Sequence, residues 1–263
     1  MRIEEIKLNN YKRFTDLIIT DIPKSAKVVF LVGSNGSGKS SLFDGLLRSD
    51  VGIDFDFNYH AKSTDDTVMW DNLVKIKFHE DNLLKKNNLN GKLYLRTAYR
   101  NQPDFSVSNL VKQESPIRNR AIAKLIDNDV TVESNYHRLV SQTMSELFDD
   151  KNNSKLVGEL REELLAKIRD SLNRIFCDLT LQSIGNPIVN GSFYFAKRSS
   201  LNFHYKNLSG GEKSVFDLIL DLVLKREYFT DAIYCIDEPE AHLHTSTQAL
   251  LFQELYELVP GNS

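Results

Sequence analysis

Residues 27–40 read Lys-Val-Val-Phe-Leu-Val-Gly-Ser-Asn-Gly-Ser-Gly-Lys-Ser, and this stretch decides the fold. Its first part, residues 28–32, is a continuous run of β-branched and apolar side chains, which is typical of a strand buried on both faces of a parallel sheet. The run leads straight into a glycine-rich loop, and a helix is expected over residues 39–47. Strand, glycine loop and helix in that order predict an α/β protein with a parallel core sheet.

The loop carries the complete pattern G-x-x-x-x-G-K-S. Its backbone N–H groups can converge on a phosphate at the positive end of the following helix. Lys39 supplies a charge to the β- and γ-phosphates, and the Ser40 hydroxyl is a Mg²⁺ ligand. A chance glycine-rich turn is the alternative, which the flanking strand and helix disfavour. The predicted nucleotide-binding residues are Gly33, Ser34, Asn35, Gly36, Ser37, Gly38, Lys39, Ser40 and Ser41.

Two acids follow a second apolar run near the end of the chain. Residues 232–236 predict a buried strand, and Asp237 and Glu238 come directly after it. Ligands of open α/β sheets bind at the carboxyl ends of the strands, so Asp237 is expected to hold Mg²⁺. Glu238 suits polarising an attacking water, which makes Glu238 and Lys39 the candidate catalytic residues. A solvated strand end is the alternative interpretation of the two acids.

A second anion site is predicted at Leu-Ser-Gly-Gly-Glu, residues 208–212. Ser209, Gly210 and Gly211 precede an apolar-faced helix, so a hydroxyl and backbone N–H groups gather at its start. The alternative is an N-terminal capping box formed by Ser209 and Glu212. One chain has no obvious second phosphate for this site, which suggests a dimer closed by nucleotide.

The whole chain indicates a cytoplasmic protein without a global basic surface. Its 263 residues carry a net charge of −3, unlike an obligate nucleic-acid binder, although a local basic face stays open. The N-terminus has acids where a secretory signal would be apolar, and no stretch is long and apolar enough for a membrane span. Cys177 and Cys235 fit neither a disulfide framework nor a zinc spacing and are expected to be buried thiols.

The remaining elements follow from periodicity. Apolar alternation predicts strands, and helical spacing of Leu and Ile, clearest over residues 154–176, predicts compact helices. Strands are expected around residues 3–8, 17–19, 74–78, 92–97, 193–195 and 201–203, helices over 118–176, 215–223 and 247–258, and a hairpin-like loop over 82–91.

The order of glycine loop, Leu-Ser-Gly-Gly-Glu and Asp-Glu-Pro resembles that of ABC-type ATPase heads. In that family two heads sandwich two ATP molecules, and the signature of one head contacts the γ-phosphate held by the other. The resemblance implies that Ser209, Gly210 and Gly211 act in trans. It also implies ATP and Mg²⁺ as cofactors and a P-loop NTPase fold with N-terminal antiparallel strands and an inserted helical lobe.

Details of the motifs resemble the SMC, RecF and OLD branch more than transporters. The opening Ile-Lys-Leu-Asn-Asn-Tyr-Lys-Arg-Phe is similar to the first strand and turn of those heads, where a basic residue approaches the nucleotide; Lys12 and Arg13 match it, with a solvated turn as the alternative. Asp-Glu-Pro-Glu-Ala-His-Leu-His resembles OLD-like ATPases of bacterial anti-phage defence. His244 then falls at a position that faces the partner head, with a solvated helix start as the alternative. Gln102 is the candidate Q-loop residue sensing metal and γ-phosphate, or else a surface residue.

The resemblance divides the chain into three parts: a nucleotide-binding lobe at 1–49, mixed strands with the helical lobe at 50–206, and a return to the nucleotide lobe at 207–263. The middle part is too short for long coiled-coil arms. ABC heads continue into another core strand that ends in a switch histidine, and no residue here fits that role. We therefore expect a missing C-terminal core strand, an unpaired sheet edge beside the glycine-loop strand, and a shortened or naturally split protein.

Together these features predict an ATP-binding and ATP-hydrolysing switch that closes as a homodimer or higher oligomer and controls an effector, a nuclease being the one the resemblance suggests. The alternatives are a DNA repair or chromosome-maintenance ATPase, for which DNA is the partner, and a non-hydrolysing ATP-dependent scaffold. A transporter subunit is a third alternative that the motif details disfavour, and no membrane partner is expected. Glu238 favours hydrolysis, whereas the lack of a switch histidine favours the scaffold.

Overall fold

The computed structural model describes residues 1–48, 73–79, 92–98, 105, 113–117, 134–189 and 191–260. At one end of the molecule lies an antiparallel sheet of order β2-β1-β3, built from β1 (Ile3–Tyr11), β2 (Phe14–Ile19) and β3 (Val74–Phe78). Tight turn residues Lys12 and Arg13 join β1 to β2, as the sequence predicted.

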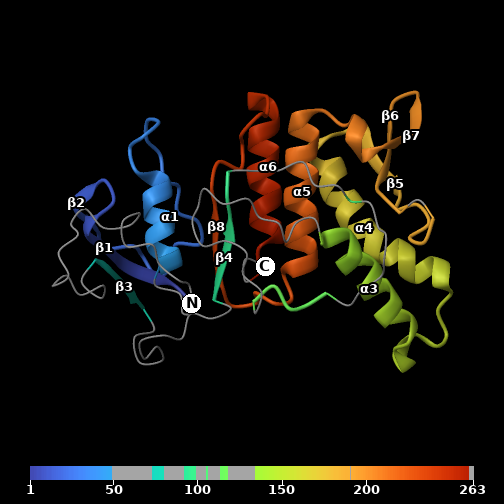
Figure 1. Ribbon diagram of the computed structural model, residues 1–263, viewed down its shortest axis with the longest axis horizontal. Helices are drawn as coiled ribbons and strands as arrows, with labels where there is room; N and C mark the ends of the chain where they lie inside the picture. The colour runs from blue at the N-terminus through green and yellow to red at the C-terminus, as the bar shows by residue number, and fades with distance from the viewer. Residues whose placement is uncertain are drawn as a thin grey trace.

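A parallel strand pair occupies the middle of the molecule (Figure 1). It is formed by β4 (Leu93–Arg96) and β8 (Ile233–Ile236), with Leu93 opposite Ile233. Helix α1 (Lys39–Arg48) packs between this pair and the antiparallel sheet (Figure 1). The small apolar core of this half contains Ile6, Leu8, Tyr11, Leu42, Leu46, Leu47, Leu73, Leu93 and Cys235.

The predicted strand at residues 28–32 is wrong. These residues form no strand, and Val28, Val29, Phe30 and Val32 are 45%, 56%, 65% and 93% exposed. Only Leu31 packs against the small core. An apolar run becomes a buried strand when neighbouring strands satisfy its backbone and cover its faces, and the described residues provide no such strand pairing here. No strand follows α6 in the described part of the chain either.

The other half of the molecule is a helical layer beside a small sheet (Figure 1). Helices α4, α5 and α6 pack against one another, and α3 packs on α4 and α5. The sheet has the antiparallel order β5-β6-β7, of which β5 was not predicted. The elements are α3 (Asn135–Leu147), η3 (Asp150–Asn152), α4 (Val157–Ile175), β5 (Leu179–Ser183), β6 (Tyr194–Lys197), β7 (Ser200–His204), η4 (Tyr205–Asn207), α5 (Gly210–Lys225) and α6 (Thr245–Leu258).

Helix α5 is the centre of the larger core. Phe216 is fully buried and makes ring contacts with four other aromatic side chains, Phe105, Phe193, Phe195 and Tyr205. Three of these contacts are edge-to-face and the contact with Tyr205 is tilted; edge-to-face pairs stabilise a core beyond the area they bury. The helix was predicted from its apolar residues, and its burial on nearly all sides explains why polar residues on it must find partners.

One such residue is Asp221, which is fully buried. It pairs with Lys225 at 2.5 Å and accepts hydrogen bonds from Tyr94 Oη at 2.5 Å and Asn135 Nδ2 at 2.8 Å. Burial alone would raise the pKa of the Asp221 carboxyl, but Lys225 and the nearby Arg96 lower that pKa to about 2. This polar cluster ties α5 to β4 and α3 inside the core.

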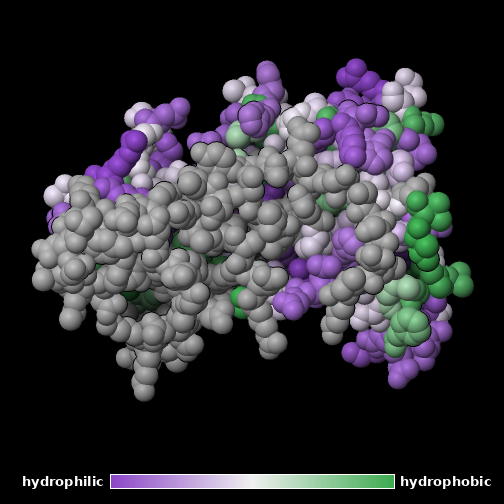
Figure 2. Space-filling model, in the orientation of Figure 1, coloured by the Kyte–Doolittle hydropathy of each residue, from purple (hydrophilic) through white to green (hydrophobic). Residues whose placement is uncertain are grey.

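Apolar side chains also reach the surface. Figure 2 shows them at the end of the molecule where the β5–β6 connection and the α3–α4 junction lie. The exposed large apolar residues of these segments include Phe148, Leu156, Val157, Ile188 and Val189. Of the two cysteines, Cys235 is buried as predicted, but Cys177 is exposed, because it follows the last turn of α4 on the solvent side. The hairpin expected over 82–91 and the helix expected over 118–133 lie outside the described residues.

Candidate nucleotide and metal site

The phosphate loop, residues 33–40, joins the extended segment to α1. Gly38 has φ +104°, and a Cβ there would lie 2.4 Å from Phe14 Cζ, so only glycine fits beside this ring. The Lys39 ammonium lies over the loop and donates to the carbonyl oxygens of Gly33 at 2.8 Å and Ser34 at 3.1 Å. The first turn of α1 contains no acidic residue, which leaves the positive helix end suited to an anion.

The structure brings the phosphate loop and the acid after β8 together. Ser40 Oγ donates to Asp237 Oδ2 at 3.0 Å across 197 residues of sequence. Two neighbouring ligands of an octahedral Mg²⁺ lie about 2.9 Å apart, so the observed spacing fits a shared Mg²⁺. Among the described residues no group of three or more His, Cys, Asp or Glu could hold a metal. A Mg²⁺ held by one carboxylate, one hydroxyl and nucleotide phosphates needs no such group.

Asp237 and Glu238 lie in different surroundings although they are neighbours. Asp237 is buried; burial and the charge of Glu238 raise the pKa of its carboxyl, and the hydrogen bond from Ser40 opposes that rise. Glu238 is exposed and has φ +45°, a left-handed backbone that glutamate rarely adopts. Strained residues of this kind cluster at functional sites. The strain turns the chain sharply after β8, and Glu238 projects to the solvent side, accessible to a water.

The signature turn, residues 208–212, is a capping box. Ser209 Oγ accepts from the Glu212 N–H at 3.3 Å, and the Ser209 N–H donates to Glu212 Oε2 at 2.8 Å. The capping interpretation is therefore confirmed. It does not exclude an anion contact, because Ser209 and Gly210 are exposed and the Ser209 hydroxyl proton is not used by the cap.

The two glycines of this turn have different surroundings. A Cβ on Gly210 would meet nothing within 4 Å. A Cβ on Gly211 would lie 2.9 Å from the His242 carbonyl oxygen and 3.1 Å from Leu243 Cδ2. The start of α5 thus packs directly on the turn that follows Asp237 and Glu238 in the same chain, where His242 also has a left-handed φ of +69°.

The two basic residues between β1 and β2 take separate positions. The Lys12 ammonium pairs with the buried carboxylate of Asp44 in α1. Arg13 Nη1 donates to the Gly36 carbonyl oxygen at 2.6 Å and so lies on the phosphate loop. Their contact with nucleotide stays a prediction, for which Arg13 is the better placed of the two.

The last two candidate site residues are His244 and Gln102. His244 is exposed and caps α6: its Nδ1 lies 2.9 Å from Ser246 Oγ and accepts from the Ser246 N–H at 3.4 Å. Its contact with a partner head stays a prediction. Gln102 lies outside the described residues.

A glycine loop that opens a helix, with a hydroxyl beside the acid of a neighbouring parallel strand, defines a P-loop NTPase, which confirms the predicted fold class. The chain belongs to the family described as "AAA domain, putative AbiEii toxin, Type IV TA system", which matches residues 71–262. A second family, described as "AAA domain", matches residues 1–69. The protein is therefore an AAA-type ATPase domain.

Comparison with solved structures gives a distant likeness. The crystal structure of the SmcHead bound to the C-winged helix domain of ScpA aligns over 100% of this chain and 86% of that chain, with 15% identity and a TM-score of 0.43. No curated protein matches the chain. Within the described residues, no helix has both the length and the apolar character needed to cross a bilayer.

One residue at the signature turn was not predicted from the sequence. Lys197, at the end of β6, donates from its Nζ to Glu212 Oε1 at 2.6 Å. No spacing rule connects a strand lysine to the first turn of the next helix. An available signal was Glu212, an acid in the first turn of a helix that is rich in apolar residues.

Proposed function

We propose that this chain is an ATP-hydrolysing switch that closes as a nucleotide-sandwiched dimer and controls an effector in anti-phage defence. The observation that carries the ATPase part is the Ser40–Asp237 pair, whose spacing fits Mg²⁺ at the phosphate loop. The family description, with its toxin of a type IV toxin–antitoxin system, supports a role in which the output is a regulated effector. A nuclease is our candidate effector.

The residues divide the chemistry as follows. Bound Mg-ATP supplies the reactive γ-phosphate and the charge that neutralises it. Lys39 would hold the β- and γ-phosphates, and Ser40 and Asp237 would hold the metal. Glu238 would orient a water and accept its proton, for which its exposed position at the carboxyl end of β8 is suited.

The signature turn supports the dimer part. Ser209 and Gly210 are exposed at the start of a long buried helix, and the Ser209 O–H is available to donate to an oxyanion. The second chain would present its γ-phosphate to this turn. Arg13, which lies on the phosphate loop, is a candidate for contact with the nucleotide of its own chain, and the exposed His244 is a candidate for contact with the partner chain.

The test is the mass of the Glu238→Gln variant in solution, measured by light scattering with and without Mg-ATP. We expect the mass to double from 30.1 kDa in Mg-ATP, because binding is kept and hydrolysis is not. Lys39→Ala in the same background should remain monomeric and bind no ATP, since it removes the phosphate-loop charge. Ser209→Arg should bind ATP and remain monomeric. A Glu238→Gln chain that binds ATP and stays at 30.1 kDa would contradict the sandwich.

A further inference from the structure

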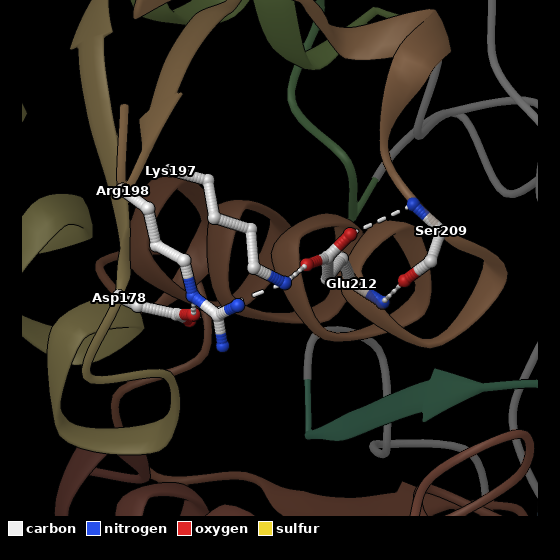
Figure 3. A network of polar contacts seen from close by, with 5 residues as sticks. All are labelled: Asp178, Lys197, Arg198, Ser209 and Glu212. Carbon is white, nitrogen blue, oxygen red and sulfur yellow. Dashed lines mark hydrogen bonds and ion pairs between the residues drawn. The ribbon is translucent and has the colours of Figure 1, made fainter. Parts of the chain in front are cut away.

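The signature turn is connected to the β5-β6-β7 sheet by a chain of polar contacts (Figure 3). Each oxygen of the Glu212 carboxylate has its own partner. Oε2 accepts from the Ser209 N–H at 2.8 Å, and Oε1 accepts from Lys197 Nζ at 2.6 Å. Lys197 is the last residue of β6, so one buried carboxylate joins the end of a strand to the serine of the signature turn.

The charged forms of Glu212 and Lys197 stabilise each other. Burial would raise the pKa of the Glu212 carboxyl, but the bonds from Lys197 and Ser209 lower that pKa below its usual value. The same hydrogen bond with Glu212 raises the pKa of the Lys197 ammonium. Without the lysine, a carboxylate that is 7% exposed would lose its counter-ion, which favours either protonation or rotation toward water. In both cases the acceptor for the Ser209 N–H weakens.

Arg198 provides the contrast within the same hairpin. Its Nε donates to Asp178 Oδ2 at 3.0 Å, its side chain is 80% exposed, and it forms no hydrogen bond or ion pair with Glu212. Lys197 lies 4.0 Å from the same Asp178, at the limit of an ion pair, and its closer partner is Glu212. Two adjacent cations of one strand end therefore differ in whether they reach the signature turn.

We propose that Lys197 is a positioning residue for Ser209: through Glu212 it fixes the serine in the geometry with which the signature turn meets the phosphate of a second chain. The inference rests on the proposed function for its consequence, the closing of the dimer. Its first step, the ordering of Ser209, concerns the single chain and can be measured without nucleotide.

The test compares Lys197→Met with Arg198→Gln, both in the Glu238→Gln background. Amide hydrogen exchange of Ser209, followed by NMR without nucleotide, reports the cap itself. We expect exchange about tenfold faster in Lys197→Met, unchanged in Arg198→Gln and restored in Lys197→Arg. With Mg-ATP, the chain concentration at half dimerisation should rise about tenfold in Lys197→Met only, while ATP binding stays unchanged.

A double variant checks that the lysine acts through the glutamate. Lys197→Met added to Glu212→Gln should change Ser209 exchange no further, since the link is already broken. Unchanged Ser209 exchange in Lys197→Met would overturn the proposal, as would an additive effect in the double variant. If exchange responds as expected but even the parent chain stays monomeric in ATP, the positioning role holds and the sandwich fails.

Discussion

The two helix starts that we propose to contact phosphate are held in opposite ways. Helix α1 begins after an exposed glycine loop and has no acid in its first turn. Helix α5 begins with a closed capping box whose Glu212 satisfies the Ser209 N–H. A start without a cap can give its N–H groups to a ligand, whereas a capped start has already used some of them. The start of α1 is therefore suited to binding a phosphate with several N–H groups, and the start of α5 to adding a single contact to a phosphate that is held elsewhere.

The two helix starts also differ in how deeply the neighbouring residues are buried. The segment that leads into α1 exposes four apolar side chains, and only Leu31 reaches the small core. Helix α5 is buried along nearly its whole length, with Phe216 and the Asp221 cluster inside the large core. We infer that α5 is rigidly packed and that the segment leading into the phosphate loop is weakly packed. The following variants test that difference.

Asp221→Asn should have the largest effect. It leaves Lys225 buried without its counter-charge, which costs about 3–5 kcal/mol of the free energy of unfolding. Urea denaturation measures this, with the exposed Asp16→Asn as a control expected within about 0.5 kcal/mol of the parent. A loss as small as that of the control would contradict a rigid α5.

The same variant carries a pH signature. The folded-state pKa of Asp221 is about 2, below its ordinary value of 3.8, so its stabilisation is present above pH 3.8 and is lost as pH falls toward 2. The stability gap between the parent and Asp221→Asn should therefore narrow when urea denaturation is repeated at successively lower pH through this window. A constant gap would mean that Asp221 is not held ionised by its neighbours.

Gly211→Ala against Gly210→Ala should give an intermediate effect. The Gly211 methyl would lie 2.9 Å from the His242 carbonyl oxygen, so α5 must shift from the turn after β8, at about 1–3 kcal/mol. The Gly210 methyl meets open space and should leave stability within about 0.5 kcal/mol of the parent. Thermal unfolding of the two variants decides it. Equal destabilisation would show that the contact with His242 does not hold the turn.

Much of the fold could be predicted because local patterns determined it. Apolar residues identified β1, β2 and β3, and helical spacing identified α4, whose apolar residues lie on one face. Helix α5 was identified by its apolar residues, although it is buried on nearly all sides. The Ser40–Asp237 contact was also expected, because both residues were predicted to hold the same Mg²⁺. The strand expected before the loop is not formed, so the contact does not depend on it.

What could not be predicted depends on partners far along the chain. An apolar run such as residues 28–32 forms a buried strand only if other strands flank it, and the residues of the run do not indicate whether such strands are present. The pairing of Lys12 with Asp44 and that of Lys197 with Glu212 follow from tertiary packing and have no spacing signature. The capping box was visible as an alternative, but not the lysine that completes it.

Phe30→Ala should have the smallest effect, and its neighbour provides the control. Phe30 is 65% exposed and makes an edge-on ring contact with Phe252 at 5.4 Å, so removal of its ring should cost less than about 1 kcal/mol of the free energy of unfolding. Leu31→Ala removes a side chain packed on the small core and should cost more, about 2 kcal/mol. Urea denaturation of both variants gives the order. If Phe30→Ala costs as much as Leu31→Ala, Phe30 is covered in solution, and the segment before the phosphate loop is as firmly packed as α5.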